Sequence, residues 1–312
     1  MRLRGSVVAA ANVRNGLGFA AVLLALPMLH ASAQIPGDAE KRMREAAPKA
    51  ATVRPRRART VLIWNTPAAY MDQDPHKGYC IPYGEAAMRL LGEQSGAFRP
   101  VVSDDVAMFL PENLRRFDAI VLNNASGPWI KPTEADLPRL RSAGTEIGAV
   151  EAALRKSLLD WLEAGHGIVG THYAIAGNPQ WPEFTALFGA KFTGHPWNEE
   201  VGVKLDAPGS PLTRAFDGKP FRIADEIYEF GPPYERAKLN VLLSLDTAAT
   251  NMGVPWITRK DGDFAQAWTR RQGKGRVFYC GFGHRWEVWT NPCVMRFFLD
   301  GIQWACGDLV AR

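Results

Sequence analysis

The chain has 312 residues, of which 46% are hydrophobic and 22% are charged. This composition is typical of a globular protein and excludes a disordered chain, a collagen-like repeat and a coiled coil. The formal net charge of +5 suggests an acidic partner, but part of that charge lies in an N-terminal segment with the features of a secretory signal.

Residues 1–33 have the three parts of a signal peptide. Three arginines accompany an apolar stretch over residues 16–29, and Ala31-Ser32-Ala33 has the small-residue pattern of a cleavage site. The apolar stretch is shorter than the roughly 20 residues of a membrane-spanning helix, although an uncleaved anchor is the other interpretation. Cleavage lowers the formal charge from +5 to +2. We therefore expect an exported protein, periplasmic or extracellular, with no membrane association after cleavage.

Residues 34–58 are expected to form a solvated linker, with a short helix left open, before a domain over residues 59–309. They contain basic residues, alanines and prolines but no periodic apolar face. They also lack the aromatic residues that accompany basic residues in nucleic-acid-binding segments. No nucleic-acid partner is expected.

The four cysteines, Cys80, Cys280, Cys293 and Cys306, form no C-x-x-C pair. Neither a zinc knuckle nor a redox motif is indicated. Cys293 and Cys306 are predicted on one helix, about 20 Å apart, which prevents a disulfide between them. A domain of this size does not need disulfides, so buried free thiols are expected.

Strands and helices alternate through the first half of the domain. Short apolar strands are predicted over residues 60–64, 99–103, 118–123 and 167–171, and helices over residues 83–96 and 146–164. The strands are continuous apolar runs, a pattern typical of a parallel sheet with helices on both faces.

The second half is richer in predicted strands. These cover residues 201–205, 222–230, 240–245, 264–270 and 276–280, and the last two form a hairpin. A closing helix over residues 291–305 has Asn291 as its cap and Pro292 at its first position. The whole pattern predicts one doubly wound, mostly parallel α/β domain with a β-rich insertion around residues 195–260.

Polar residues follow the predicted parallel strands, where an open sheet of this kind binds its ligands. They are Asn65, Thr66, Asp72, Asp74, His76 and Tyr79 after the first strand, Asn123, Asn124 and Ser126 after the third, His172 and Tyr173 after the fourth, and His284 after the strand over residues 276–280.

His172 stands at the centre of Gly170-Thr171-His172-Tyr173-Ala174, which has the spacing of a nucleophile elbow. A histidine at this position argues against nucleophilic acyl transfer. It can act as a general base, a hydrogen-bond donor or a metal ligand, or simply bond a backbone carbonyl. His195 is placed in a loop over residues 193–196. On the strand over residues 222–230, Glu226 and Tyr228 share one face.

Several segments together resemble the ThuA-like (trehalose utilisation) family of the class I glutamine amidotransferase-like superfamily. They cover residues 61–64, 117–121, 165–172, 194–196, 225–228, 241–245, 267–268, 276–284 and 301–307. The resemblance implies a flavodoxin-like sheet and a histidine, His172, in place of the amidotransferase cysteine. It also implies that His172, His195, Glu226 and His284 border the pocket. His76 lies two positions from the histidine usual in the family.

The resemblance further implies a role in the catabolism of a disaccharide or 3-keto-glycoside. A 3-keto group acidifies the neighbouring carbon, so the glycosidic bond can break by proton abstraction and elimination, for which histidine is a suitable base. The enolate oxygen needs a divalent metal, a second histidine or an amide donor. His172, His284 and Glu226 are therefore the expected catalytic residues. His172, His195 and His284 are the expected ligands of a divalent metal, and a metal-free site stays open.

The expected partner is a small carbohydrate, and a homo-oligomer is left open. The residues predicted to bind substrate are Thr66, His76, Tyr79, Asn123, Asn124, Tyr173, His195, Tyr228 and Trp286. The alternative function is a non-catalytic sugar-binding or accessory module with the same pocket. Glutamine amidotransfer is not expected, because no cysteine occupies the elbow.

Overall fold

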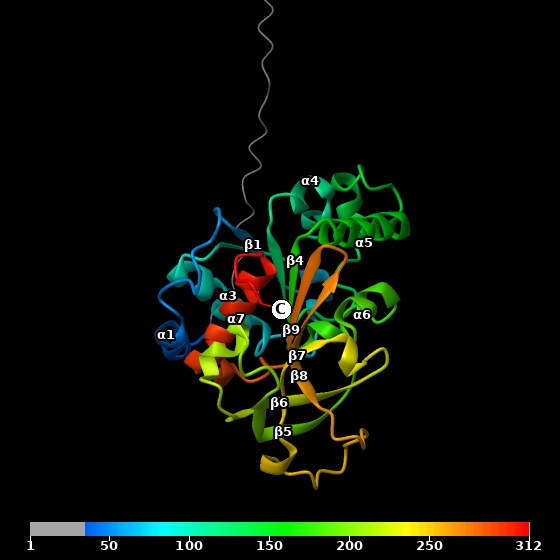
Figure 1. The fold of residues 1–312 in the computed structure, drawn as a ribbon. Coiled ribbons are helices and arrows are strands. Elements are labelled where there is room, and N and C mark those ends of the chain that lie inside the picture. The colour runs from blue at the N-terminus through cyan, green and yellow to red at the C-terminus, as the bar shows by residue number, and fades with distance from the viewer. Residues whose placement is uncertain (1–34, 312) are drawn as a thin grey trace, which may run out of the picture.

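This computed structural model describes residues 35–311 of the chain. These residues form helices around one mixed sheet (Figure 1). Within this range nine strands lie in the order β2-β1-β3-β4-β9-β8-β7-β5-β6. The predicted signal peptide, residues 1–33, lies outside the described residues. None of the described helices is both long and apolar enough to cross a membrane.

The parallel half of the sheet carries the flavodoxin-like strand order. Its strands are β1 (Thr60–Trp64), β2 (Arg99–Ser103), β3 (Ala119–Asn123), β4 (Gly167–Thr171) and β9 (Gly275–Cys280). β1 pairs with β2 and β3, β3 with β4, and β4 with β9, all in parallel. Every residue of β3 and β4 is buried, because helices cover both faces of a parallel sheet. The predicted fold class is confirmed.

The antiparallel half extends the same sheet. Its strands are β5 (Lys191–Leu205), β6 (Phe221–Gly231), β7 (Asn240–Leu245) and β8 (Ala265–Gln272). β9 pairs with β8, β8 with β7, β7 with β5, and β5 with β6, all antiparallel. The β-rich region expected as an insertion is therefore a continuation of the central sheet.

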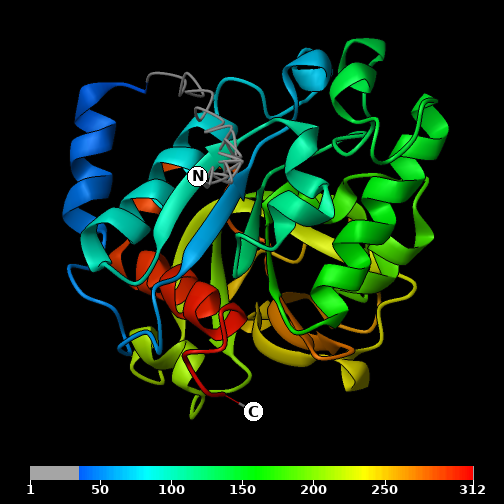
Figure 2. The same ribbon diagram turned by 90° about the horizontal axis from the view of Figure 1, so that it is seen from above.

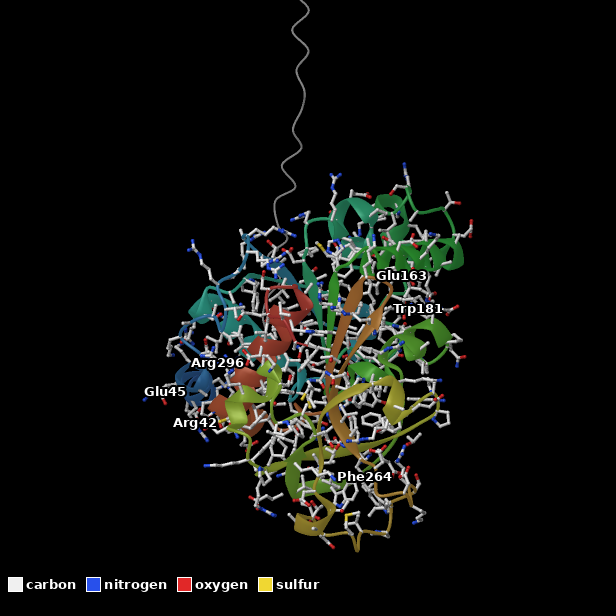
Figure 3. All side chains as sticks on the ribbon, in the orientation of Figure 1. Arg42, Glu45, Glu163, Trp181, Phe264 and Arg296 are labelled. Carbon is white, nitrogen blue, oxygen red and sulfur yellow. The ribbon has the colours of Figure 1, made fainter. Side chains whose placement is uncertain are left out.

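Helices cover the two faces of the sheet (Figure 2). On one face lie α1 (Gly37–Ala46), α3 (Ile81–Ser95) and α7 (Pro292–Ala305), and on the other α4 (Pro111–Leu114), α5 (Ile147–Glu163) and α6 (Pro182–Phe188). Two apolar clusters fill the space between helices and sheet, one on each face. Arg42 and Arg296 mark one side and Trp181 the other (Figure 3). The predicted cap of α7 is confirmed, since the Asn291 side chain accepts from the amides of Cys293 and Val294.

Short helices occupy the connections. α2 (Ala68–Met71) follows β1, and the 3-10 helices are η1 (Val106–Phe109), η2 (Glu134–Arg139), η3 (His172–Ala176), η4 (Pro211–Phe216), η5 (Arg236–Lys238), η6 (Thr247–Ala249) and η7 (Trp286–Thr290). Two of them matter for the candidate site. η3 begins at the predicted elbow and η7 begins two residues after His284.

The expected solvated linker over residues 34–58 is wrong for its described part. α1 packs its buried Met43 into the apolar cluster that contains α3 and α7. Farther along, the amide of Thr52 donates to Gln303 Oε1 at 2.8 Å, and Gln303 returns a bond to the carbonyl of Val53. Few apolar residues are needed for this docking, so the sequence pattern is too weak to reveal it.

All four cysteines are free thiols, as predicted. Cys80, Cys280 and Cys306 are buried, and Cys293 is half-buried. Cys293 lies in the first turn of α7, and Cys306 caps its C-terminus, which keeps the two sulfurs far apart.

Asp300 on α7 is a buried carboxylate with unused hydrogen-bonding capacity. The Thr52 hydroxyl donates to its Oδ1, whereas Oδ2 has no hydrogen-bond partner among the described residues. The residue is 1% exposed. Burial raises the pKa of Asp300 to about 6, against the opposing effect of the Thr52 hydrogen bond.

We predict that Asp300→Asn stabilises the protein by about 1–2 kcal/mol at pH 7.5. Because the folded-state pKa is raised, wild-type stability falls as pH rises from the ordinary aspartate range through about 6. Asparagine keeps the acceptor for Thr52 without this loss, so the gain should vanish near pH 4. Urea unfolding at both pH values measures it.

The matched control is Asp160→Asn, at an exposed ion pair with Lys156 on α5. Its stability should change little at either pH. Equal or lower stability of Asp300→Asn at pH 7.5, relative to wild type, would contradict the prediction.

Candidate functional site

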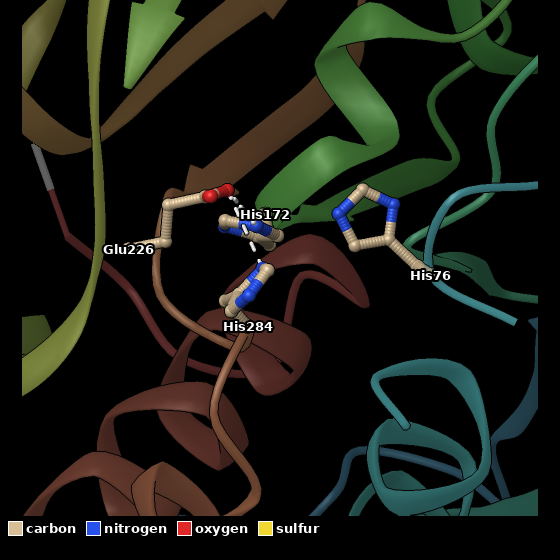
Figure 4. A group of neighbouring side chains, drawn as sticks. All are labelled: His76, His172, Glu226 and His284. Carbon is tan, nitrogen blue, oxygen red and sulfur yellow. Dashed lines mark ion pairs between the residues drawn. The ribbon is translucent and has the colours of Figure 1, made fainter. Parts of the chain in front are cut away.

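Four side chains from four separate segments meet at the carboxyl edge of the parallel strands (Figure 4). His76 follows β1, His172 follows β4, His284 follows β9, and Glu226 comes from β6. One nitrogen or carboxylate oxygen of each residue lies within 4.8 Å of those of the other three. We call these four residues the histidine–glutamate group. Such donors at such spacing can hold a divalent cation.

His172 occupies a tight turn between β4 and η3. Its φ of 45° is unusual for a residue with a side chain, which agrees with the predicted elbow. A Cβ at Gly170 would lie 2.5 Å from the ring of Phe188, so the turn needs glycine there. His172 Nδ1 lies 2.7 Å from the carbonyl oxygen of Gly281 and therefore carries the proton. Nε2 is left as the acceptor, and the Tyr228 hydroxyl donates to it at 2.5 Å.

The Asp74 carboxylate holds His76 on the side of the ring away from the group. The amide of His76 donates to Asp74 Oδ1 at 2.9 Å, and the Thr66 hydroxyl donates to Asp74 Oδ2 at 2.6 Å. His76 Nδ1 lies 3.6 Å from the same carboxylate. On the other side its ring packs against Tyr173, with 4.5 Å between centroids. A carboxylate behind a histidine is the usual means of orienting a metal ligand.

Glu226 provides the negative charge of the group. Its Oε2 lies 3.3 Å from His172 Nε2 and 3.3 Å from His284 Nδ1, and its Oε1 lies 3.4 Å from His195 Nδ1. Burial acts to raise the pKa of Glu226, but protonated His172, with His284 and His195, outweighs it and lowers the pKa to about 2. The direction of this shift favours the ionised carboxylate.

His172 and His284 favour the neutral form. Burial lowers the pKa of His172 to about 4, although Glu226 opposes the shift. Burial also lowers the pKa of His284. Metal ions bind neutral imidazole and ionised carboxylate, so His172, His284 and Glu226 already have the protonation states of ligands at neutral pH.

His195 lies at the rim of the histidine–glutamate group rather than in it. The predicted loop around it is wrong, because the ladder of β5 with β6 continues through these residues with two register shifts. Such bulges redirect a side chain. The His195 side chain is 44% exposed. Of the predicted ligand set, the structure thus brings together His172 and His284, and it adds His76 in the place expected for His195.

Three residues predicted to bind substrate have partners within the protein. Thr66, Asn123 and Asn124 are all buried. Thr66 bonds Asp74, Asn123 Nδ2 donates to the carbonyl of Ile81, and Asn124 Oδ1 accepts from the amide of Tyr173. Their contact with a substrate stays a prediction.

The predicted aromatic residues differ in their placement. Tyr228 and Tyr173 contact His172 and His76, whereas the ring of Tyr79 lies 5.2 Å from that of His284 and is 44% exposed. Trp286 in η7 packs on Tyr83, under the guanidinium of Arg42. Trp286 therefore packs against side chains of α1 and α3.

Asp225 has a role that the sequence did not reveal. It is fully buried on the face of β6 opposite Glu226. Its two oxygens accept from the amides of Gly283 and Arg285, both at 2.8 Å. These amides flank His284, so Asp225 holds the turn that presents this histidine. The alternation of faces along β6 is the signal that could have pointed to it.

We predict that Asp225→Ala lowers the free energy of unfolding by about 2 kcal/mol or more. The substitution leaves two buried amides without an acceptor, and each such loss costs about 1–3 kcal/mol. Urea unfolding at pH 7.5 measures the change. Glu200→Ala, at an exposed ion pair on β5, is the control and should have little effect. A variant as stable as the wild type would show that Asp225 does not secure the turn.

Comparison with known proteins agrees with this architecture. A family model described as "Trehalose utilisation" (ThuA) matches residues 60–305. A putative ThuA-like protein from Bacteroides uniformis shares the fold with a TM-score of 0.57 at 23% identity, over 81% of this chain and 92% of that one. A second, from Parabacteroides merdae, has a TM-score of 0.55 at 15% identity, over 82% and 92%. No curated protein matches the chain. The chain belongs to the ThuA family.

Proposed function

We propose that the protein is an exported enzyme of carbohydrate catabolism that acts on a disaccharide or 3-keto-glycoside, with a divalent metal ion held by the histidine–glutamate group. The observation that carries this proposal is the convergence of four ligand-type atoms within 4.8 Å. The family's description, trehalose utilisation, supports a disaccharide substrate, and the pattern of residues 1–33 supports export.

The residues present suit a metal of the zinc type. Three imidazoles and one carboxylate form a common ligand set for such ions. One of the imidazole nitrogens, His284 Nδ1, is buried without a hydrogen-bond partner among the described residues. Buried polar atoms are normally satisfied, so a bound ion would account for its arrangement. Binding at His172 Nε2 requires the Tyr228 hydroxyl to give up its bond.

A divalent ion here supplies Lewis acidity toward a carbonyl or enolate oxygen. The general base must then come from outside the ligand set. His195 meets this condition, because it is partly exposed and its Nδ1 lies 3.4 Å from Glu226. Glu226 orients the ring.

The proposed step is an elimination on a 3-keto-glycoside. His195 takes the proton from the carbon between the keto group and the anomeric carbon. The electron pair moves onto the keto oxygen and then forms a carbon–carbon double bond as the glycosidic bond breaks. The proton held by His195 returns to the departing oxygen. Tyr228 keeps its proton throughout, because burial raises its pKa well above the ordinary value, so it can donate a hydrogen bond to an anionic oxygen.

We predict one divalent ion per chain in purified protein. His76→Ala and His172→Ala should each weaken its binding at least about tenfold, because each removes one ligand. Elemental analysis and titration of the apoprotein with Zn²⁺ measure this. His166→Ala, at a histidine stacked on Trp161 outside the group, should bind the ion like the wild type. Equal metal content in all three variants would contradict the proposed centre.

We further predict that His195→Ala keeps the metal but lowers kcat for a 3-keto-disaccharide about 10²-fold or more, since it removes the general base. Chelation should abolish turnover, and Zn²⁺ should restore it. Full activity in chelator, or in His195→Ala, would refute this mechanism. Sugar binding without any turnover, in the metal-loaded protein, would instead support a non-catalytic accessory module.

A further inference from the structure

Two exposed aromatic rings lie beside the histidine–glutamate group. Among the described residues, the exposed large hydrophobic side chains are Tyr79, Met252, Trp256 and Val310. Trp256 is 66% exposed and its ring lies 6.2 Å from that of His195. Tyr79 is 44% exposed and its ring lies 5.2 Å from that of His284. Both exposed aromatic rings of this set are therefore neighbours of site histidines.

The loop that carries Trp256 is fastened on both sides of this residue. Before it, the carbonyl of Asn251 accepts from the indole of Trp197 at 2.8 Å. After it, the amides of Thr258 and Arg259 donate to Glu229, at 3.1 and 3.2 Å. Glu229 is fully buried on β6. Trp256 is thus exposed on a loop whose backbone is hydrogen-bonded to the rest of the protein on both sides of it.

Tyr79 is fixed from the other side of the site. The thiol of the next residue, Cys80, donates to the carbonyl of His284 at 3.0 Å, and its amide donates to the carbonyl of His76 at 3.2 Å. The backbone that carries Tyr79 is therefore bonded to two members of the histidine–glutamate group.

A chain of contacts links the two rings through Glu226. Its Oε1 faces His195, which neighbours Trp256, and its Oε2 faces His284, which neighbours Tyr79. The contacts run in sequence from Trp256 through His195, Glu226 and His284 to Tyr79, so the carboxylate and the proposed base belong to the same continuous set of contacts as both rings.

We propose that Trp256 and Tyr79 are stacking platforms for two neighbouring sugar rings of the substrate. A pyranose presents an apolar face of C–H bonds with partial positive charge, which suits the electron-rich face of an aromatic ring. Two platforms with the reacting groups between them select a disaccharide or longer glycan whose glycosidic bond lies over Glu226. This inference rests on the proposed function and assigns its specificity.

Kinetics with two substrates test the proposal. Trp256→Ala and Tyr79→Ala should each raise KM for a 3-keto-disaccharide about tenfold, with kcat changed less than about threefold. For a methyl 3-keto-glucoside, which has one sugar ring, only one of the two variants should raise KM. Trp256→Phe and Tyr79→Phe should restore most of the affinity. Met252→Ala, on the same loop as Trp256, is the control and should behave like the wild type.

The outcomes separate this inference from the proposed function. An unchanged KM in both alanine variants, with turnover still dependent on metal, would overturn the platforms and leave the function standing. Loss of trehalose binding in both variants, measured by calorimetry in a protein without turnover, would support the platforms although catalysis fails. If Trp256→Ala separates a dimer and leaves trehalose affinity unchanged, the ring serves self-association and the proposal is wrong.

Discussion

The ionised carboxylate of Glu226 is the interaction on which the site depends. It lies within 3.4 Å of nitrogens of His172, His195 and His284, and these histidines come from three different segments. Without this charge, buried imidazoles would face one another with no group to stabilise a proton or an ion among them. Glu226 comes from β6, at the edge of the sheet, whereas His172 and His284 follow central strands. The site therefore forms only because β6, the edge strand of the antiparallel half, places Glu226 beside the carboxyl ends of the parallel strands.

The side chains on the two faces of β6 have different roles. Glu226 and Tyr228 point toward the histidines, and Tyr228 bonds His172 directly. Asp225 and Glu229, on the opposite face, accept from backbone amides: the first from the turn of His284, the second from the loop of Trp256. Both are fully buried. One strand thus carries a proposed metal ligand, Glu226, and a hydrogen-bond donor, Tyr228. It also holds the turn of His284 and the loop of Trp256.

The sequence predicted much of the scaffold because its signals are local. The bounds predicted for β1, β2, β4 and β7 are those observed. For β1, β4 and β7 the reason is a continuous apolar run, which marks a buried strand. The elbow at His172 also follows from neighbouring small residues. The docking of residues 35–58 and the bulge at His195 depend on partners far along the chain, so no local pattern reveals them. His76 has the same difficulty: its place beside His172 follows from the course of the loop after β1, which is secured by Asp74.

The hydrogen bonds between residues 52–59 and the C-terminal part of the chain also affect the order in which the protein folds. Thr52 and Gln303 are 251 positions apart, and Arg56 and Arg59 bond Asp308 still farther on. During synthesis, residues 35–59 therefore have no native partner on α7 until almost the whole chain has been made. Contacts of such long range slow folding because a large loop must close before they form. The segment over residues 52–59 therefore completes its native hydrogen bonds only after the final helix has been made, although it precedes every strand of the sheet in the chain.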